Sequence, residues 1–399
     1  MNVLRTLIFL LISSSLSAQV IEVSASEHSY YRTPVFVKLP VATSTKQVYW
    51  LRNKQTGKST AAQMVDSTTL VFILPDSLPA GKTFQYEVEL SRDGGSSHIV
   101  NVQQGKETVQ VNIRNRPLLV YHTATVQPPA DSPAYYARSG FIHPLYSPNG
   151  KILTDDFPAG HAHQHALFSA WTNTTFKKEF TDFWNQHLQK GTVEHIAVEK
   201  INEGLVVTQL QLLLRYKSTQ FGEVLKERWT ITVYPFSSYF LFDLYSDQLN
   251  TSTDTLFINT YHYGGLAFRG SREWNPDDKV NYTNNWHILT SEGIKDSSAN
   301  GTHAGWVDAS GTVNGAMAGV TVFNHPANFR YPQAIRVHPA FPYWCYTPAP
   351  DGPFFIAPGA HYQSRYRYFV HNGGANTAQI KQLESEWISP PAVKYIREK

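Results

Sequence analysis

Residues 204–218 read GLVVTQLQLLLRYKS, and an apolar residue stands at nearly every second position of its second half. This alternation predicts a β-strand with one buried face. Similar stretches, several longer than the usual strand of five or six residues, are spread over the last 280 residues. They are VLKERWTITVYP (224–235), SYFLFDLYSDQL (238–249), AMAGVTVFNHP (316–326) and QSRYRYFVHNG (363–373). Long alternating strands of this kind indicate large stacked antiparallel sheets, and therefore a large β-sandwich.

The residues before this region predict a second, smaller β unit. Short strand candidates such as VFVKLP, TLVFILP and TFQYEVEL are separated by turn-forming stretches such as KQTGK and SRDGGSS. Helix signals are few, at 179–189 (EFTDFWNQHLQ) and 377–389 (TAQIKQLESEWIS). We therefore predict an all-β chain with a small N-terminal immunoglobulin-like β-sandwich over 19–113 and a supersandwich domain, which carries the active site, over 114–399.

Composition and the N-terminus narrow the class of protein. The 399 residues are 42% hydrophobic and carry a net charge of +3, which argues for a folded core and against nucleic acid as a partner. Residues 1–18 have the pattern of a cleavable signal peptide, and no later run is long enough to span a membrane. We expect a periplasmic or secreted protein. Cys345 is the single cysteine, so no internal disulfide forms.

Histidines gather in the predicted second unit. The stretch HAHQH (161–165) places imidazoles at every second position, which in a strand would share one face. Two such imidazoles can ligate one divalent metal, and Zn, Cu, Fe and Ni are equally compatible. We predict His161, His163 and, from another segment, His303 as ligands. The alternative is that these histidines are structural or contact a sugar without metal.

Other polar residues near glycine, proline or tryptophan complete a predicted cleft. Asp156 and Asp308 are candidate acid–base groups, with turn or capping roles as the alternative. Arg138 and Arg269 are candidate clamps for carboxylate or hydroxyl groups, or structural ion-pair partners. The remaining predicted substrate-binding residues are His143, His325 and Trp274, the last as a platform for a sugar ring. No motif for a nucleotide cofactor, zincin or serine hydrolase is present.

Six ordered stretches within residues 114–372 resemble one known family. They include the segment 135–172 (YYARSG to FSAWT), DFWNQHLQKGTVEH (182–195), YGGLAFRG (263–270), HAGWVDASG (303–311), AGVTVFNHPANFRYP (318–332) and PGAHYQSRYRYFVHNG (358–373). Together they are similar to the DUF6807 family, some members of which are labelled methane oxygenase (PmoA-like). His161 and His163 match histidines that many members share.

A looser resemblance is to galactose-mutarotase-like supersandwich proteins, through INTYHYGG (258–265) and the later PGAHYQSRYR. It implies His262 as the general acid that protonates a sugar ring oxygen. The sequence departs from that pattern at His361, where the resemblance implies a glutamate.

These observations predict a carbohydrate-active enzyme, a lyase, hydratase or isomerase acting on a saccharide or sugar acid. The alternatives are a non-catalytic glycan-binding protein and a metal-dependent oxygenase.

Overall fold

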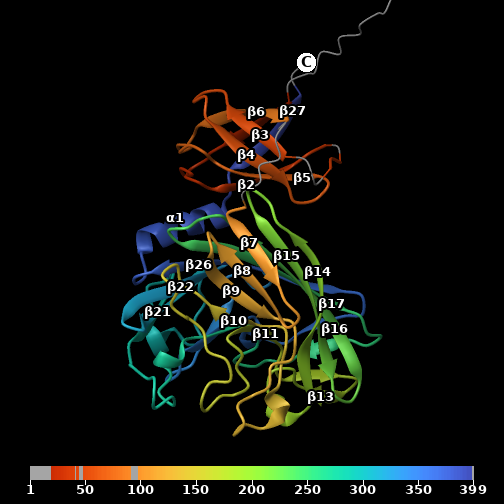
Figure 1. Cartoon of the computed structure of the whole chain (residues 1–399). Helices are drawn as coiled ribbons and strands as arrows, with labels where there is room; N and C mark the ends of the chain where they lie inside the picture. The colour runs from red at the N-terminus through yellow and green to blue at the C-terminus, as the bar shows by residue number, and fades with distance from the viewer. Residues whose placement is uncertain (1–18, 41, 45–47, 91–97, 398–399) are drawn as a thin grey trace, which may run out of the picture. The chain divides into compact units, whose positions relative to one another are not determined.

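The computed structural model describes residues 19–40, 42–44, 48–90 and 98–397. The predicted signal peptide lies outside these residues. The described residues divide into two compact units, one of those from 19 to 90 together with 391–397 and the other of residues 98–390 (Figure 1). The first unit is thus made from both ends of the chain.

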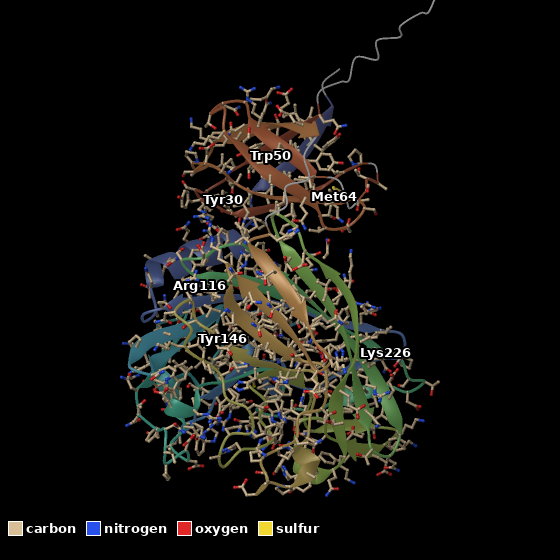
Figure 2. The ribbon with its side chains drawn as sticks, in the orientation of Figure 1. Tyr30, Trp50, Met64, Arg116, Tyr146 and Lys226 are labelled. Atoms are coloured by element: carbon tan, nitrogen blue, oxygen red, sulfur yellow. The ribbon has the colours of Figure 1, made fainter. Side chains whose placement is uncertain are left out.

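The first unit is a single antiparallel sheet in the order β2-β5-β4-β3-β6-β1-β27, whose edge strands β2 and β27 approach each other. Tyr30 and Met64, both labelled in Figure 2, belong to its buried core. Its strands are β1 (Gln19–Ser24), β2 (Pro34–Lys38), β3 (Val48–Asn53), β4 (Ser59–Met64), β5 (Thr69–Ile73), β6 (Thr83–Leu90) and β27 (Ala392–Arg397).

The second unit contains two eight-stranded antiparallel sheets. The first has the order β23-β24-β19-β11-β10-β9-β8-β7. Its strands are β7 (Val100–Gln104), β8 (Thr108–Ile113), β9 (Arg116–His122), β10 (Ile142–Leu145), β11 (Leu167–Ala170), β19 (Gly265–Arg269), β23 (Ala334–Val337) and β24 (Tyr343–Thr347).

The second sheet has the order β14-β15-β16-β17-β26-β22-β21-β20. Its strands are β14 (Gly191–Asn202), β15 (Thr208–Ser218), β16 (Gly222–Val233), β17 (Phe240–Asn250), β20 (Trp286–Thr290), β21 (Trp306–Val313), β22 (Ala316–Asn324) and β26 (His361–Asn372). The long strands expected around 204–218, 224–235, 238–249, 316–326 and 363–373 are therefore confirmed.

The two sheets share one core, because alternate residues of each face inward. In β15 the buried residues are Leu210, Leu212, Leu214 and Tyr216, and they belong to the same cluster as inward residues of β9 and β11. Tyr121 of β9 meets Trp229 of β16 edge to face, with ring centroids 6.1 Å apart. Figure 1 shows β7 to β10 beside β14 to β17. The all-β prediction is confirmed.

Two smaller elements complete the second unit. A four-stranded sheet has the order β13-β12-β18-β25, with β12 (Thr174–Phe176), β13 (Glu179–Thr181), β18 (Leu256–Ile258) and β25 (Phe354–Ile356). The helix α1 (Thr377–Ile388) is the one α-helix among the described residues, as predicted there. The Asn376 side chain caps it by accepting the Gln379 N–H.

Two predicted boundaries differ from the structure. We predicted a helix over 179–189, but these residues form β13 and a 3₁₀ turn over Gln186–Leu188. The buried Asp182 binds backbone N–H groups there and replaces the helical hydrogen bonds. We also placed the domain boundary after residue 113. In the structure β7 and β8 pair with β9 in the second unit, while β27 pairs with β1 in the first.

Candidate functional site

The HAHQH stretch forms a turn in the structure and not the predicted strand. The His161 N–H donates to the Pro158 carbonyl (3.0 Å), and the Gln164 N–H donates to the His161 carbonyl (2.9 Å). Gly160, at φ 79°, sits at the start of this turn. Because a turn does not alternate faces, His165 points away from the other two histidines into the core, where it is fully buried.

His161 and His163 line a cleft of about 340 Å³. Nine of its twelve lining residues are histidine, tyrosine or tryptophan, so rings form most of its wall. Among the described residues that line it, none is aspartate or glutamate. The lining residues are His161, His163, Gln164, Trp184, Asn185, His187, Tyr261, His262, Tyr263, Arg336, His338 and Tyr343.

Four separate chain segments supply these residues. The first is the turn at 161–164, and the second follows β13 from Trp184 to His187. The third lies between β18 and β19 at 261–263, and the fourth runs from the end of β23 to the start of β24. The cleft is thus formed by connections that the strands hold in place, which is where ligand sites on β scaffolds commonly occur.

Asp182 fixes the second of these segments. Its buried carboxylate accepts the backbone N–H groups of Trp184 (2.9 Å) and Asn185 (2.6 Å). It also accepts from the Thr172 hydroxyl (2.7 Å) and from the Asn185 side-chain amide (2.9 Å). Asn185 in turn accepts the Tyr263 hydroxyl (2.9 Å), so one buried carboxylate orders two walls of the cleft.

The imidazole rings lie close to one another. The centroids of His161 and His163 are 5.8 Å apart, those of His161 and His338 are 5.4 Å apart, and those of His163 and His187 are 6.0 Å apart. His262 stands on the exposed rim, in contact with the rings of Tyr261 and Tyr263 at 4.4 and 4.8 Å. The rim and the floor therefore present different histidines to a ligand.

Burial keeps four of the cleft histidines neutral, namely His161, His163, His262 and His338. It lowers the pKa of His163 to about 3 and that of His338 to about 4, and neighbouring cationic groups add to both shifts. Burial also lowers the pKa of His161 and of His262. Near neutral pH these imidazoles carry no charge, so each can accept a proton or offer a lone pair.

Two arginines give the cleft a positive field. Arg336 lines it, and one of its terminal nitrogens, Nη1, donates to Asn300 (2.9 Å). Arg269 is fully buried behind the lining, where Nη1 donates to Gln164 (2.9 Å) while Nε and Nη2 have no hydrogen-bond partner among the described residues. The carboxylates of Asp155 and Asp277 lie close enough to Arg269 to offset part of its charge, so Arg336 is the cation that the lining itself presents to an anionic ligand group.

The structure brings three of the eleven predicted site residues into this cleft, namely His161, His163 and His262. Arg269 does not line the cleft, but it donates a hydrogen bond to Gln164, which does.

Four of the other predicted residues lie in different surroundings within the second unit. Asp156 is bound to His165 (3.0 Å) rather than to His161. Arg138 is buried and donates to the Ser169 carbonyl (2.9 Å). His143 lines a separate hollow with Lys151 and Arg272. Asp308 is buried on β21 between His371 (2.9 Å) and Thr321 (2.7 Å).

The last three predicted residues are also outside the cleft. Trp274 is fully buried and donates its indole N–H to the Thr312 carbonyl, so no face is free for a sugar. His303 bonds Asp351 at 3.0 Å, away from His161 and His163. His325 packs on Trp387, with ring centroids 4.8 Å apart. Neighbouring glycine, proline or tryptophan residues mark His303 and His325 as parts of connections, but they do not show that these connections reach the cleft.

Sequence reasoning missed several lining residues. His187 lay in the stretch predicted as a helix, and His338 was seen as one of many histidines without a role. Tyr261 and Tyr263 flank His262, so the alternation in TYHY was the available signal. Arg336 carried no sequence signal, because its place beside the cleft depends on the pairing of β23 with β24.

Among the described residues, no group of three or more His, Cys, Asp or Glu side chains is arranged to hold a metal ion. The donor chemistry nevertheless suits a transition metal, because His161 and His163 are neutral and adjacent.

The described helices include none that is long and apolar enough to cross a membrane.

The fold and the cleft define an all-β protein with a supersandwich domain and a histidine-lined site. Residues 108–385 match the family of unknown function DUF6807, and the chain belongs to this family. The resemblance seen in the six sequence stretches is therefore confirmed. No curated protein matches the sequence.

Solved structures with a similar fold include carbohydrate enzymes. An α-mannosidase from Enterococcus faecalis V583 is 9% identical, with a TM-score of 0.44 over 96% of this chain and 46% of its own. A galactose mutarotase related enzyme from Lactobacillus acidophilus is 10% identical, with a TM-score of 0.29 over 68% of this chain and 97% of its own. This chain spans about half the length of the mannosidase. These similarities are distant and concern the fold alone.

Proposed function

We propose that this protein is a carbohydrate-active enzyme that transfers a proton next to the carboxylate of a sugar acid in the histidine cleft. The observation that carries the proposal is the cleft lining, where rings and neutral imidazoles surround a cationic side chain without a carboxylate. Rings stack on the apolar faces of sugars, and Arg336 would bind the acid group.

The lining also selects between reaction classes. Glycoside hydrolysis ordinarily needs two carboxyl groups on either side of the scissile bond, and the described lining offers none. Proton abstraction from the carbon next to a carboxylate instead needs a neutral base and a positive field for the enolate-like charge. His262 is a neutral, exposed base, and Arg336 with the buried Arg269 supplies the field.

The proton balance allows two outcomes. His262 takes the proton from the carbon and becomes an imidazolium. If water delivers a proton to the opposite face, the product is the epimer, and the imidazolium then gives its proton to the hydroxide that remains. If the imidazolium instead gives its proton to an oxygen substituent that leaves the neighbouring carbon, the product is an unsaturated sugar acid, as in a lyase.

The test is solvent deuterium exchange. The protein is incubated in D₂O with free hexuronic acids and with uronate-containing disaccharides, and NMR follows the proton next to the carboxylate. We expect exchange, epimerisation or elimination with at least one of them. His262→Ala should lower the rate by about 10²- to 10⁴-fold, the usual contribution of a general base. His287→Ala is the matched control, because that imidazole is 69% exposed and lies outside the cleft lining.

If no hexuronate shows exchange, or if His262→Ala exchanges at the wild-type rate, the proposal fails. Binding of the same sugars without turnover would leave the second of our sequence-based hypotheses, a non-catalytic glycan-binding protein.

The same cleft supports one further proposal, that of a bound divalent metal. His161 and His163 would hold it, with His187 or His338 as a third ligand in place of the distant His303. A metal there would stabilise negative charge on the substrate, or would serve the oxygenase chemistry suggested by the family label. Elemental analysis after loading with Zn, Cu, Fe or Ni should find about one ion per chain, lost in the His161→Ala/His163→Ala double variant.

We also propose export to the periplasm or the medium, on the strength of the signal-peptide pattern in residues 1–18. N-terminal sequencing of the protein from cell fractions should find the mature chain beginning at Gln19 outside the cytoplasm.

A further inference from the structure

The small sheet β13-β12-β18-β25 carries a row of exposed phenylalanines on one face. Phe180 of β13 pairs with Thr175 of β12, Thr175 pairs with Phe257 of β18, and Phe257 pairs with Phe355 of β25. The three phenylalanines are 44%, 48% and 62% exposed. We call Phe180, Phe257 and Phe355 the phenylalanine row.

The phenylalanine row is not part of the hydrophobic core. The opposite face of the same sheet is buried and includes Phe176, Leu256, Ile258 and Ile356. Since residues alternate in a strand, the row faces outward in all three strands. Isolated exposed phenylalanines are ordinary, but three in register across one sheet form a patch of the kind that binds a partner.

A hollow lies at each end of the row. Beside Phe180 is one of about 140 Å³, whose polar lining includes Gln189, Lys190, Ser218 and Gln220. Beside Phe355 is one of about 370 Å³, lined by further aromatic side chains and by His361 and Gln363. The row therefore connects two hollows that carry hydrogen-bonding groups.

The row is elongated, and its rings are not coplanar, since the planes of Phe257 and Phe355 meet at 53°. Neighbouring strands lie about 4.8 Å apart, so a row across four strands extends for roughly 14 Å. The Phe257 and Phe355 ring centroids are 6.1 Å apart. Between Phe180 and Phe257 stands Thr175, whose hydroxyl accepts the Asn259 amide (3.0 Å). A ligand that fits this surface is long, has repeated apolar faces and carries hydroxyl groups along its edges.

We propose that the phenylalanine row binds a segment of a linear, neutral polysaccharide. Successive sugar rings stack on Phe180, Phe257 and Phe355, because the C–H faces of pyranoses are apolar and as flat as the aromatic rings. Amide and hydroxyl groups in the two hollows bind the sugar hydroxyls. Among the described residues that line the hollows, Lys190 is the one lysine or arginine, and His361 is held by Asp247 (2.7 Å). Arg330 packs over Phe329 and Phe354 beside the second hollow, but its guanidinium donates to backbone carbonyls. The surface therefore offers little to a polyanion.

The chain connects the row to the histidine cleft. β13 continues through Asp182 to Trp184 and Asn185, and β18 is followed by Tyr261 to Tyr263, all in or beside the cleft. A polysaccharide held on the row thus lies next to the segments that form the cleft. The inference does not rest on the proposed function, because binding on the row needs none of the cleft histidines.

The test is affinity electrophoresis in native gels that contain galactomannan, hydroxyethyl cellulose, xylan or dextran, with polygalacturonate as the acidic comparison. The wild-type protein should be retarded by at least one of the four neutral polymers. The variant Phe180→Ala/Phe257→Ala/Phe355→Ala should bind that polymer about tenfold more weakly or worse, since each lost ring contact removes a measurable part of the affinity.

Two controls accompany this variant. Phe36→Ala, which removes a 42% exposed phenylalanine from the first unit, should leave retardation unchanged. If the triple variant does not fold, the single variant Phe257→Ser replaces it in the retardation assay. Its melting temperature is compared with that of the wild type to show that it is folded. His262→Ala should be retarded like the wild type, so a failed cleft proposal and a failed row proposal give different results.

No retardation in any of the four neutral gels overturns the proposal, as does retardation that persists unchanged in the folded triple variant. Self-association in sedimentation experiments that the triple variant abolishes would also overturn it, because the row would then be covered by a second copy of the chain.

Discussion

The histidine cleft and the phenylalanine row are formed by neighbouring stretches of chain but present different chemistry. The row lies on strands, where every second residue of β13, β18 and β25 faces outward. The cleft lies on the connections that follow two of those strands, where turns gather Trp184, His187 and His262 into a concave wall. Strands therefore produce an elongated, repetitive surface, while connections produce a site with a defined interior.

The largest expected effect comes from the residue between the two regions. Asp182→Ala should lower the free energy of unfolding by about 3–5 kcal/mol, because several buried donors lose their acceptor. Chemical denaturation measures this. The control is Glu179→Ala, which changes an exposed residue of the same hairpin and should alter the free energy of unfolding by no more than about 0.5 kcal/mol.

The same variant tests whether the two regions are separate. Under conditions where Asp182→Ala remains folded, turnover in the cleft should fall while polymer retardation by the row persists. Equal losses in both assays would show that the cleft and the row behave as one site.

The variant Arg336→Gln tests whether a positive charge is needed for binding in the cleft but not on the phenylalanine row. The variant should raise KM for an acidic sugar about tenfold with little change in kcat, since a charged hydrogen bond to the ligand is lost. Retardation by neutral polymers should not change. Steady-state kinetics measure the effect, with Arg228→Gln, an exposed arginine on β16 paired with Glu199, as the control. An unchanged KM would remove Arg336 from ligand binding.

A further prediction concerns a histidine outside both regions. Burial lowers the pKa of His195 to about 4, and its Nδ1 shares a hydrogen bond with the Tyr121 hydroxyl (2.9 Å). Below the ordinary value of 6.5 the unfolded chain takes up a proton that the folded protein refuses, so stability falls as pH drops from 6.5 toward 4.

His195→Gln should therefore lose less of its melting temperature than the wild type between these two pH values. Above pH 6.5 the two proteins should depend on pH alike. If the wild type and the variant lost the same amount of melting temperature between these two pH values, the pKa of His195 would not be depressed.

The sequence predicted the parts of the fold that depend on local alternation. Residues 208–218 pair with β16 over their full length and with β14 from Gln209 onward, and their buried leucines alternate as expected. The helix at 377–388 was also predictable, because Asn376 precedes a helix-forming run. The stretch 179–189 was not, since the hydrogen bonds of Asp182 outweigh the helix preference of its neighbours.

The candidate site was predictable in part. His161, His163 and His262 stood out by spacing and by resemblance, and the structure places them in one cleft. Asp308, His303, Trp274 and His325 had similar neighbours in sequence, yet they lie in the core or at other surfaces. Flanking glycines and prolines indicate a connection, but they do not indicate which connections meet in space.

Alternation and motifs are local properties of the chain. They were therefore enough to predict an all-β member of this family with histidines in its connecting segments. The tertiary structure alone decided that His187, His338 and Arg336 join the cleft and that three phenylalanines align across β13, β18 and β25. Both outcomes depend on which strands pair and in what register, and these are set by packing between residues far apart in sequence.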